Sequence, residues 1–174
     1  MSREKNMAQL DEMVVGAVAL AGGELVGRIR LQKVVYLLDQ LGMRSGAPFE
    51  YHHYGPYSEA ISDAVTDAKF WGNLKEVVSS RVTDGAPYST FKTSNPPPVR
   101  LGSLSAEDAR RYLSSFSSYS STVLELAATA HWLAFVEKVP DWSAEIEVRK
   151  AGKTGNGRLE QAVSLLRDIR LVPH

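Results

Sequence analysis

The 174-residue chain contains no cysteine. Disulfide bridges, cysteine-based zinc sites and cysteine nucleophiles are therefore excluded. The chain also lacks an excess of either charge, because 20 lysines and arginines balance 20 aspartates and glutamates. A balanced chain has no overall attraction for nucleic acid or a membrane surface, so either role would need a local basic patch. Absence of cysteine does not fix the compartment, and a reducing cytoplasm is the default expectation.

The N-terminal region holds no apolar run long enough to span a bilayer. Residues 13–21 are apolar, but this run is far shorter than the roughly 20 residues that a membrane-spanning helix needs. Asp11 and Glu12 precede it, where a secretion signal would carry positive charge. We therefore expect a buried first helix and no membrane association.

Composition and periodicity predict one mainly α (α+β) domain over residues 1–174. The chain is 44% hydrophobic and 23% charged, which is typical of soluble globular proteins. Glu24 to Gly27 is expected to be a connector, Gly55-Pro56 a turn, and Asn95 to Pro98 a stiff spacer. The patterns predict helices over about 6–21, 28–41, 57–71, 106–116, 122–138, 142–151 and 158–171, and strands over about 49–53, 74–82 and 88–93.

The order of these elements indicates a winged helix-turn-helix. Two amphipathic helices are followed by two strands, and Asp84-Gly85 between the strands is a strong hairpin signal. This hairpin would be the wing. We therefore expect a winged-helix-like part over about residues 1–94, followed by a C-terminal helical bundle over about 104–171.

The third predicted helix is acidic, although it holds the position that would read DNA in such a fold. Glu59, Asp63 and Asp67 repeat every four residues, and Lys69 is the one base between residues 57 and 71. A recognition helix derives its affinity for phosphates from lysine and arginine. The row is also typical of a solvated helix face. Where it has a function, we expect it to face a basic partner or to mimic DNA.

Two tyrosines and two basic groups complete the predicted binding residues. Tyr54 and Tyr57 flank the Gly-Pro turn and are expected to be partly exposed at an interface. The basic groups are expected to lie on the surface, where they either contact phosphate or an acidic partner or are simply solvated. One group begins the second helix, on the side opposite its apolar stripe, and the other borders a glycine-rich loop: Arg28, Arg30 and Lys33, and Arg149, Lys150, Lys153 and Arg158.

The sequence predicts no catalytic residue, metal site or cofactor. His52 and His53 are adjacent on a strand, so they point to opposite faces and do not chelate one ion easily. No Gly-x-Ser-x-Gly elbow is present. In the loop from Gly152 to Gly157, Lys153 precedes the last glycines, whereas a Walker loop places its lysine after them.

Three segments resemble the YwgA-like and Panacea (SocA-like) bacterial families. They are Leu31 to Leu38, Tyr51 to Ser58, and Leu124 to Leu133. The positions that match the family pattern are expected to fix the fold. These positions are Leu31, Gln32, Lys33, Tyr36, Gly55 and Pro56.

The resemblance implies a helical domain with an antitoxin-type role. Panacea-like domains act as antitoxins or as adapters that bind a toxin. YwgA-like domains also occur fused to macrodomains, in antitoxins paired with DNA-modifying ADP-ribosyltransferase toxins, where they form the toxin-binding half. The present chain holds no macrodomain, so hydrolase activity does not carry over.

The leading hypothesis is a non-enzymatic protein-interaction module, antitoxin-like or associated with phage defence. It would bind its protein partner, for example a cognate toxin, through the acidic helix and the nearby tyrosines. The alternative is a winged-helix DNA-binding regulator that uses the basic groups, and a third hypothesis is an enzyme with a cryptic site. Self-association into a homo-oligomer remains open.

Overall fold

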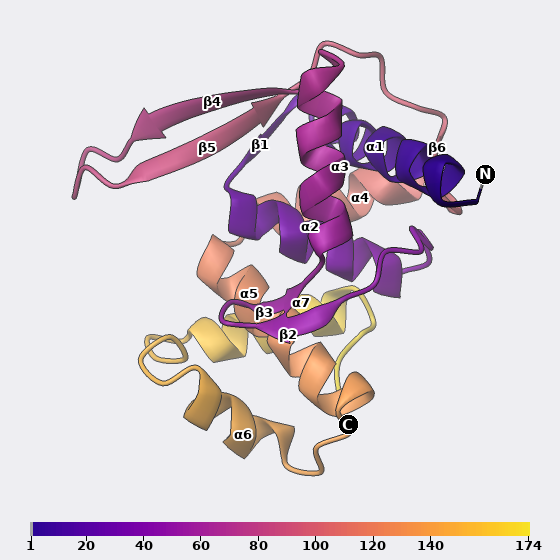
Figure 1. Ribbon diagram of the computed structural model, residues 1–174. Helices are drawn as coiled ribbons and strands as arrows, with labels where there is room; N and C mark the ends of the chain where they lie inside the picture. Colours follow the sequence, from indigo (N-terminus) through magenta and orange to yellow (C-terminus); the bar gives the residue numbers. More distant parts are fainter. Residues whose placement is uncertain (1) are drawn as a thin grey trace.

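The computed structural model describes the backbone of residues 2–174 and the side chains of residue 5 and residues 9–174. It confirms a mainly helical fold with small antiparallel strand pairs (Figure 1). The helices are α1 Ser2–Leu20, α2 Arg28–Gln40, α3 Glu59–Phe70, α4 Ala106–Ser117, α5 Ser121–His131, α6 Trp142–Arg149 and α7 Arg158–Asp168. The strands are β1 Glu24–Val26, β2 Glu50–His52, β3 Gly55–Tyr57, β4 Lys75–Ser80, β5 Pro87–Lys92, β6 Arg100–Leu101 and β7 Leu104–Ser105.

Helices α2 and α5 form the centre of the molecule. All residues from Leu31 to Leu38 of α2 are buried, as are all residues from Val123 to His131 of α5. The two helices pack against each other, while α5 also contacts α6 and α7 on its other sides. Helix α1 packs against α3 and α4 (Figure 1). One continuous apolar core therefore runs from α1 to α7.

The main sheet has three antiparallel strands in the order β1-β5-β4. The expectation that Glu24 to Gly27 is a mere connector is wrong, because β1 pairs with β5 and sets Leu25 opposite Phe91. Both side chains are buried, so β1 helps to cover the core. The predicted hairpin is confirmed as β4–β5, and it projects away from the helices (Figure 1).

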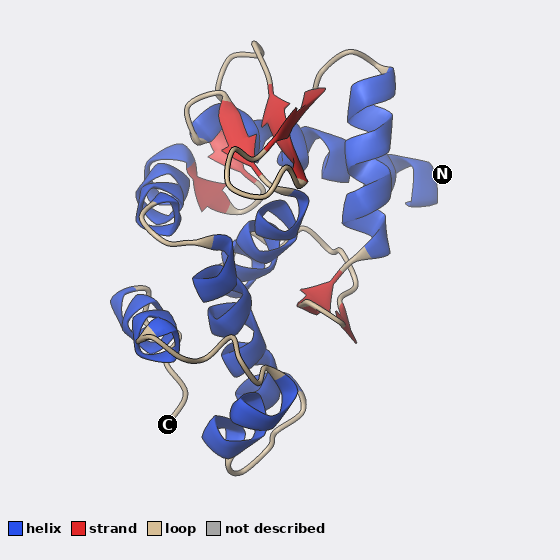
Figure 2. Cartoon of the chain, turned by 90° about the vertical axis from the view of Figure 1, so that its left-hand side faces the viewer, coloured by secondary structure: helices blue, strands red, loops and turns tan. Residues whose placement is uncertain are grey.

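A second hairpin, β2–β3, lies at the foot of α3, away from the main sheet (Figure 2). The sequence predicted a turn at Gly55-Pro56, but these residues belong to β3, and the chain reverses at His53 and Tyr54. Pro56 is tolerated because a two-stranded ladder consists only of edge strands. Helix α3 therefore begins later than predicted, at Glu59.

Two apolar segments at helix ends are exposed. Trp71, directly after α3, is 71% exposed, and Phe70 beside it is 78% exposed. Helix α3 packs through Ile61, Ala64 and Ala68 and ends before Trp71. Phe135 and Val136 are also about half exposed, because the chain widens into a π-helical turn after α5.

Two further features complete the fold. The small hairpin β6–β7 follows the proline-rich spacer and was not predicted from the sequence. Among the described residues, every helix is too short or too polar to cross a membrane.

Replacing Gly55 by alanine is expected to lower the free energy of unfolding by about 2–4 kcal/mol. Gly55 has a φ of +85°, and an added Cβ would lie 2.6 Å from the buried Thr129 hydroxyl oxygen. Gly85 in the β4–β5 turn is a matched control, since its φ is +70° but its surroundings are open. Urea unfolding should show a loss at Gly55→Ala well above that at Gly85→Ala. Equal losses would contradict the close approach of β3 to α5.

Candidate functional site

Helix α2 holds the β2–β3 hairpin through two adjacent polar side chains. The Gln32 amide accepts a hydrogen bond from the Ser58 backbone N–H at 2.9 Å and donates one to the Ser58 carbonyl at 3.0 Å. The Lys33 ammonium donates to the Pro56 carbonyl at 2.5 Å. All four residues are buried. The Gln-Lys pair and the Gly-Pro segment, far apart in sequence, thus form one structural unit.

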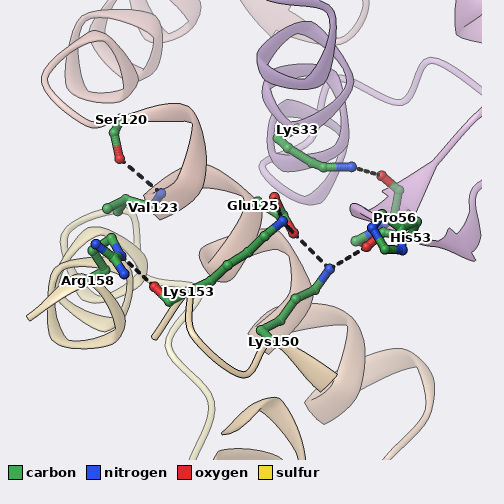
Figure 3. Close-up of polar contacts among 9 residues, drawn as sticks. All are labelled: Lys33, His53, Pro56, Ser120, Val123, Glu125, Lys150, Lys153 and Arg158. Carbon is green, nitrogen blue, oxygen red and sulfur yellow. Dashed lines mark hydrogen bonds and ion pairs between the residues drawn. The ribbon is translucent and has the colours of Figure 1, made fainter. Parts of the chain in front are cut away.

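A cluster of lysines lies next to this unit, around one carboxylate. Lys150 and Lys153 donate to Glu125 at 2.8 and 2.9 Å, and Lys150 also donates to the His53 carbonyl at 2.8 Å (Figure 3). The Glu125 side chain is 4% exposed and that of Lys150 3% exposed. Glu125 therefore ties the loop after α6 to α5, and Lys150 extends that tie to the hairpin.

The aromatic residues of the hairpin lie against these cations. The Lys153 ammonium is 4.8 Å from the centre of the Tyr54 ring, within the range of a cation–π interaction. The Arg149 guanidinium is 4.9 Å from the centre of the Tyr51 ring. The predicted tyrosine and the predicted C-terminal basic group are therefore brought together, although nearly 100 residues separate them in sequence.

Most of the predicted basic residues are used inside the protein. Lys33 and Lys150 are buried, so the expectation that they lie on the surface is wrong. The reason for Lys33 is that α2 is covered on every side between Leu31 and Leu38.

The predicted arginines also have internal acceptors. The Arg30 guanidinium donates to the carbonyls of Phe116 and Tyr119. Arg28 is exposed but donates to Glu76. Four further interactions complete the set: Arg149 pairs with Glu137 and Glu145, and Arg158 donates to the carbonyls of Gly152 and Lys153.

Raising the pH from about 8 to about 10 is expected to stabilise the protein by about 2 kcal/mol. Burial lowers the pKa of Lys33 to about 8, and the neighbouring Lys150 and Lys153 lower it further while Glu125 opposes them. A lowered pKa means that the unfolded chain holds more protons than the folded one in this window, so stability increases as the pH rises. Above about pH 10 the trend should reverse, because burial raises the pKa of Tyr36 and ionisation then favours the unfolded chain.

Urea unfolding across this pH range checks the prediction, with Lys33→Met as the matched variant. The variant should lose the increase between about pH 8 and pH 10. An unchanged increase in Lys33→Met would show that another group causes it.

The predicted acidic residues lie on a surface formed by α3 and α1. Glu59 and Asp63 are exposed, and Asp67 is half-buried near Asp11 of α1. Burial raises the pKa of Asp11, and the charges of Asp67 and the adjacent Glu12 raise it further. We call these five residues the acidic surface. Among the described side chains, none of the five forms an ion pair.

A cleft and an aromatic pair adjoin the acidic surface. Asp11 and Glu12 line a cleft of about 420 Å³ against the proline-rich spacer. One Oδ of Asp11 is buried without a hydrogen-bond partner among the described residues. At the end of α3, the rings of Phe70 and Trp71 lie 5.1 Å apart at their centres, and both are exposed.

Sequence reasoning missed several of these residues. Glu125 gives no signal because it lies in a helix that is apolar on every side. Asp11 and Glu12 were interpreted only as evidence against a secretion signal, and Phe70 and Trp71 were not singled out. The sequence alone does not show that the acidic residues of α1 and α3 lie side by side, because this depends on how the two helices pack against each other.

Comparison with known proteins gives one informative match. No family model matches the chain. The chain is similar to the uncharacterized protein YwgA of Bacillus subtilis (strain 168). The two are 24% identical over 157 residues, which cover 86% of this chain and 90% of the relative. The similarity extends over most of both chains and supports the YwgA-like resemblance.

Proposed function

We propose that the protein is a non-enzymatic interaction module that binds a basic protein partner through the acidic surface. The observation that supports the proposal is a difference between the basic and the acidic residues in whether they have partners within the protein. The seven basic residues that the sequence singled out have acceptors within the protein, whereas the five carboxylates of the acidic surface have no ion-pair partner among the described side chains. The acidic surface on α3 and α1 is therefore a local negative patch, although the whole chain is neutral.

We propose that the protein has a winged-helix scaffold that binds a protein partner in place of DNA. Its support is the order α1-β1-α2-α3-β4-β5, which the β2–β3 hairpin interrupts between α2 and α3, and the pairing of β1 with the strand that returns from the wing. In such a scaffold α3 holds the place of the recognition helix. Glu59 and Asp63 on this helix would repel phosphates. The same row of negative charges suits a protein that normally binds nucleic acid, towards which α3 would act as a DNA mimic.

The features beside the acidic surface supply specificity. Trp71 and Phe70 are exposed at the end of α3, and tryptophan is among the residues that most often dominate binding energy in interfaces. The cleft that Asp11 and Glu12 line can receive a lysine or arginine side chain, whose charge would be attracted by the two carboxylates. The partner is therefore expected to combine basic side chains with an apolar patch.

We further propose an antitoxin-like role in the cytoplasm, in which the protein neutralises or adapts a toxin. The support is the resemblance of its motifs to the YwgA-like and Panacea families and its similarity to YwgA. A toxin that acts on nucleic acid has the basic surface that the acidic surface of this protein would complement. Self-association is compatible with this role but is not required by it.

Affinity capture from the native host tests the proposal. The tagged protein should retain a basic or nucleic-acid-active protein at about 50 mM salt and release it as the salt is raised towards about 500 mM. A gel shift of duplex DNA by the purified protein serves as the discriminating control. Tight duplex binding at low salt would overturn the proposal and support the DNA-binding regulator.

A further inference from the structure

A pocket of about 210 Å³ lies between α2, α3 and the β2–β3 hairpin, separate from the acidic surface. It brings together residues that the sequence placed in different groups. Arg28 and Lys33 reach it from α2, Tyr54 and Tyr57 from the hairpin region, and Lys69 from α3.

The pocket carries an excess of positive charge, although the whole chain is neutral. Arg28, Lys33 and Lys69 line it, and Glu76 is the one carboxylate in the lining, which leaves a net charge of 3 − 1 = +2. Glu76 already accepts from Arg28 at 2.8 Å and from Lys69 at 2.6 Å. Burial alone would raise the pKa of Glu76, but the hydrogen bonds from Lys69, Ser89 and Arg28 together lower it to about 2. This carboxylate is thus ionised and fully occupied.

Lys33 is the cation with the greatest need for an anion. It is 1% exposed, and its ammonium has one acceptor among the described residues, the Pro56 carbonyl. An ammonium group carries three N–H donors, and a buried donor without an acceptor is costly. The carboxylate whose charge acts on Lys33, that of Glu125, is already shared by Lys150 and Lys153. An anion in the pocket would supply the missing charge.

The remaining walls are mostly apolar or aromatic, with Gln32, Ser62 and Thr66 as the polar members, and suit a largely apolar body. Ile29, Val65 and the two tyrosines line the pocket beside the cations, and Tyr54 is 44% exposed. The volume is below the roughly 300–1,000 Å³ that is usual for drug-sized ligands, so the occupant is small. From the charge and the walls together, we infer that this pocket binds a small organic anion, consisting of one apolar ring that carries a phosphate or a carboxylate.

Three probes of matched shape test the inference on the full chain: phenyl phosphate, benzoate and phenol. Titration followed by two-dimensional NMR should show saturable shifts at Tyr54, Tyr57 and α2 for at least one anion, with a dissociation constant below about 1 mM. The two anions distinguish a phosphate from a carboxylate as the preferred group. Phenol should bind at least about tenfold more weakly, because it has no charge at neutral pH. Equal binding of phenol, or no saturable shift with either anion, would overturn the inference.

Two variants and one control locate the binding. Lys33→Met and Arg28→Gln should each weaken binding of the preferred anion by at least about tenfold, since each removes one positive charge from the lining. Arg28→Gln changes an exposed side chain, so it decides the question even where Lys33→Met fails to fold. Arg167→Gln, on an exposed part of α7 outside the pocket, should bind as wild type does. Unchanged affinity in Arg28→Gln, or an equal loss in Arg167→Gln, would place the binding elsewhere.

Discussion

Replacing Glu125 by glutamine is expected to lower the free energy of unfolding by about 3–5 kcal/mol. The carboxylate is 4% exposed and accepts from both Lys150 and Lys153, and its charge also reaches Lys33. Glutamine can still accept a hydrogen bond, but it removes the carboxylate with which Lys150 and Lys153 form ion pairs. A buried charge that loses its partner is strongly destabilising, and a loss of this size is a large fraction of the roughly 5–15 kcal/mol by which domains are stable.

Urea unfolding monitored by circular dichroism measures this loss. Glu24→Gln is a suitable control, because Glu24 pairs with Lys92 at the surface and such pairs contribute about 1 kcal/mol or less. The double variant Glu125→Gln/Lys150→Met should recover part of the loss, since it also removes the most deeply buried cation beside Glu125. A loss in Glu125→Gln no larger than in the control would show that the cluster does not hold the β2–β3 hairpin, α5 and the loop after α6 together.

Reversing the three acidic residues of α3 is expected to weaken partner capture by at least about 100-fold. The variant is Glu59→Lys/Asp63→Lys/Asp67→Lys. Under the proposed function these carboxylates face basic side chains of the partner, and like charges opposed across an interface cost several kcal/mol. Glu59 and Asp63 are exposed and Asp67 is half-buried, so the fold should survive the change. Capture from host extract, quantified by mass spectrometry, gives the result.

A control with the same change in net charge separates the position of the charges from their number. Glu107, Glu160 and Asp168 are exposed acids on α4 and α7, away from α3. Their replacement by lysine should leave capture within about threefold of wild type, because distant surface charges are screened at physiological salt. An equal loss in both variants would mean that net charge alone governs capture, and α3 would then have no special role.

The helices could be predicted from the sequence because their pattern is local. The apolar residues of α1, α3 and α7 recur at three- and four-residue steps, and Asp84-Gly85 marks the turn of the projecting hairpin. Strand β1 could not be predicted in the same way. It is three residues long, and its identity depends on pairing with β5, more than 60 residues later in the chain.

The site was predictable as a set of residues but not as an arrangement. Tyr54 and Lys153 were both singled out, yet only the fold places one against the other. From the sequence, Lys33 is expected to be solvated, because this part of the helix has an apolar side and a polar side and Lys33 lies on the polar side. Its burial follows from the β2–β3 hairpin, which supplies a carbonyl for its ammonium. Long-range packing determines each of these positions, and the helical periodicity of the sequence does not reveal that packing.

Hydrogen exchange of the captured complex tests the central claim most directly, since it maps the surface that the partner covers. If the acidic surface binds the partner, exchange should slow on binding over α3 and Trp71, which are residues 59–71, and around Asp11 and Glu12 of α1. Exchange over α7 should remain unchanged. Protection confined to α6, α7 and the loop between them, with α3 unaffected, would contradict the proposal that the acidic surface binds the partner.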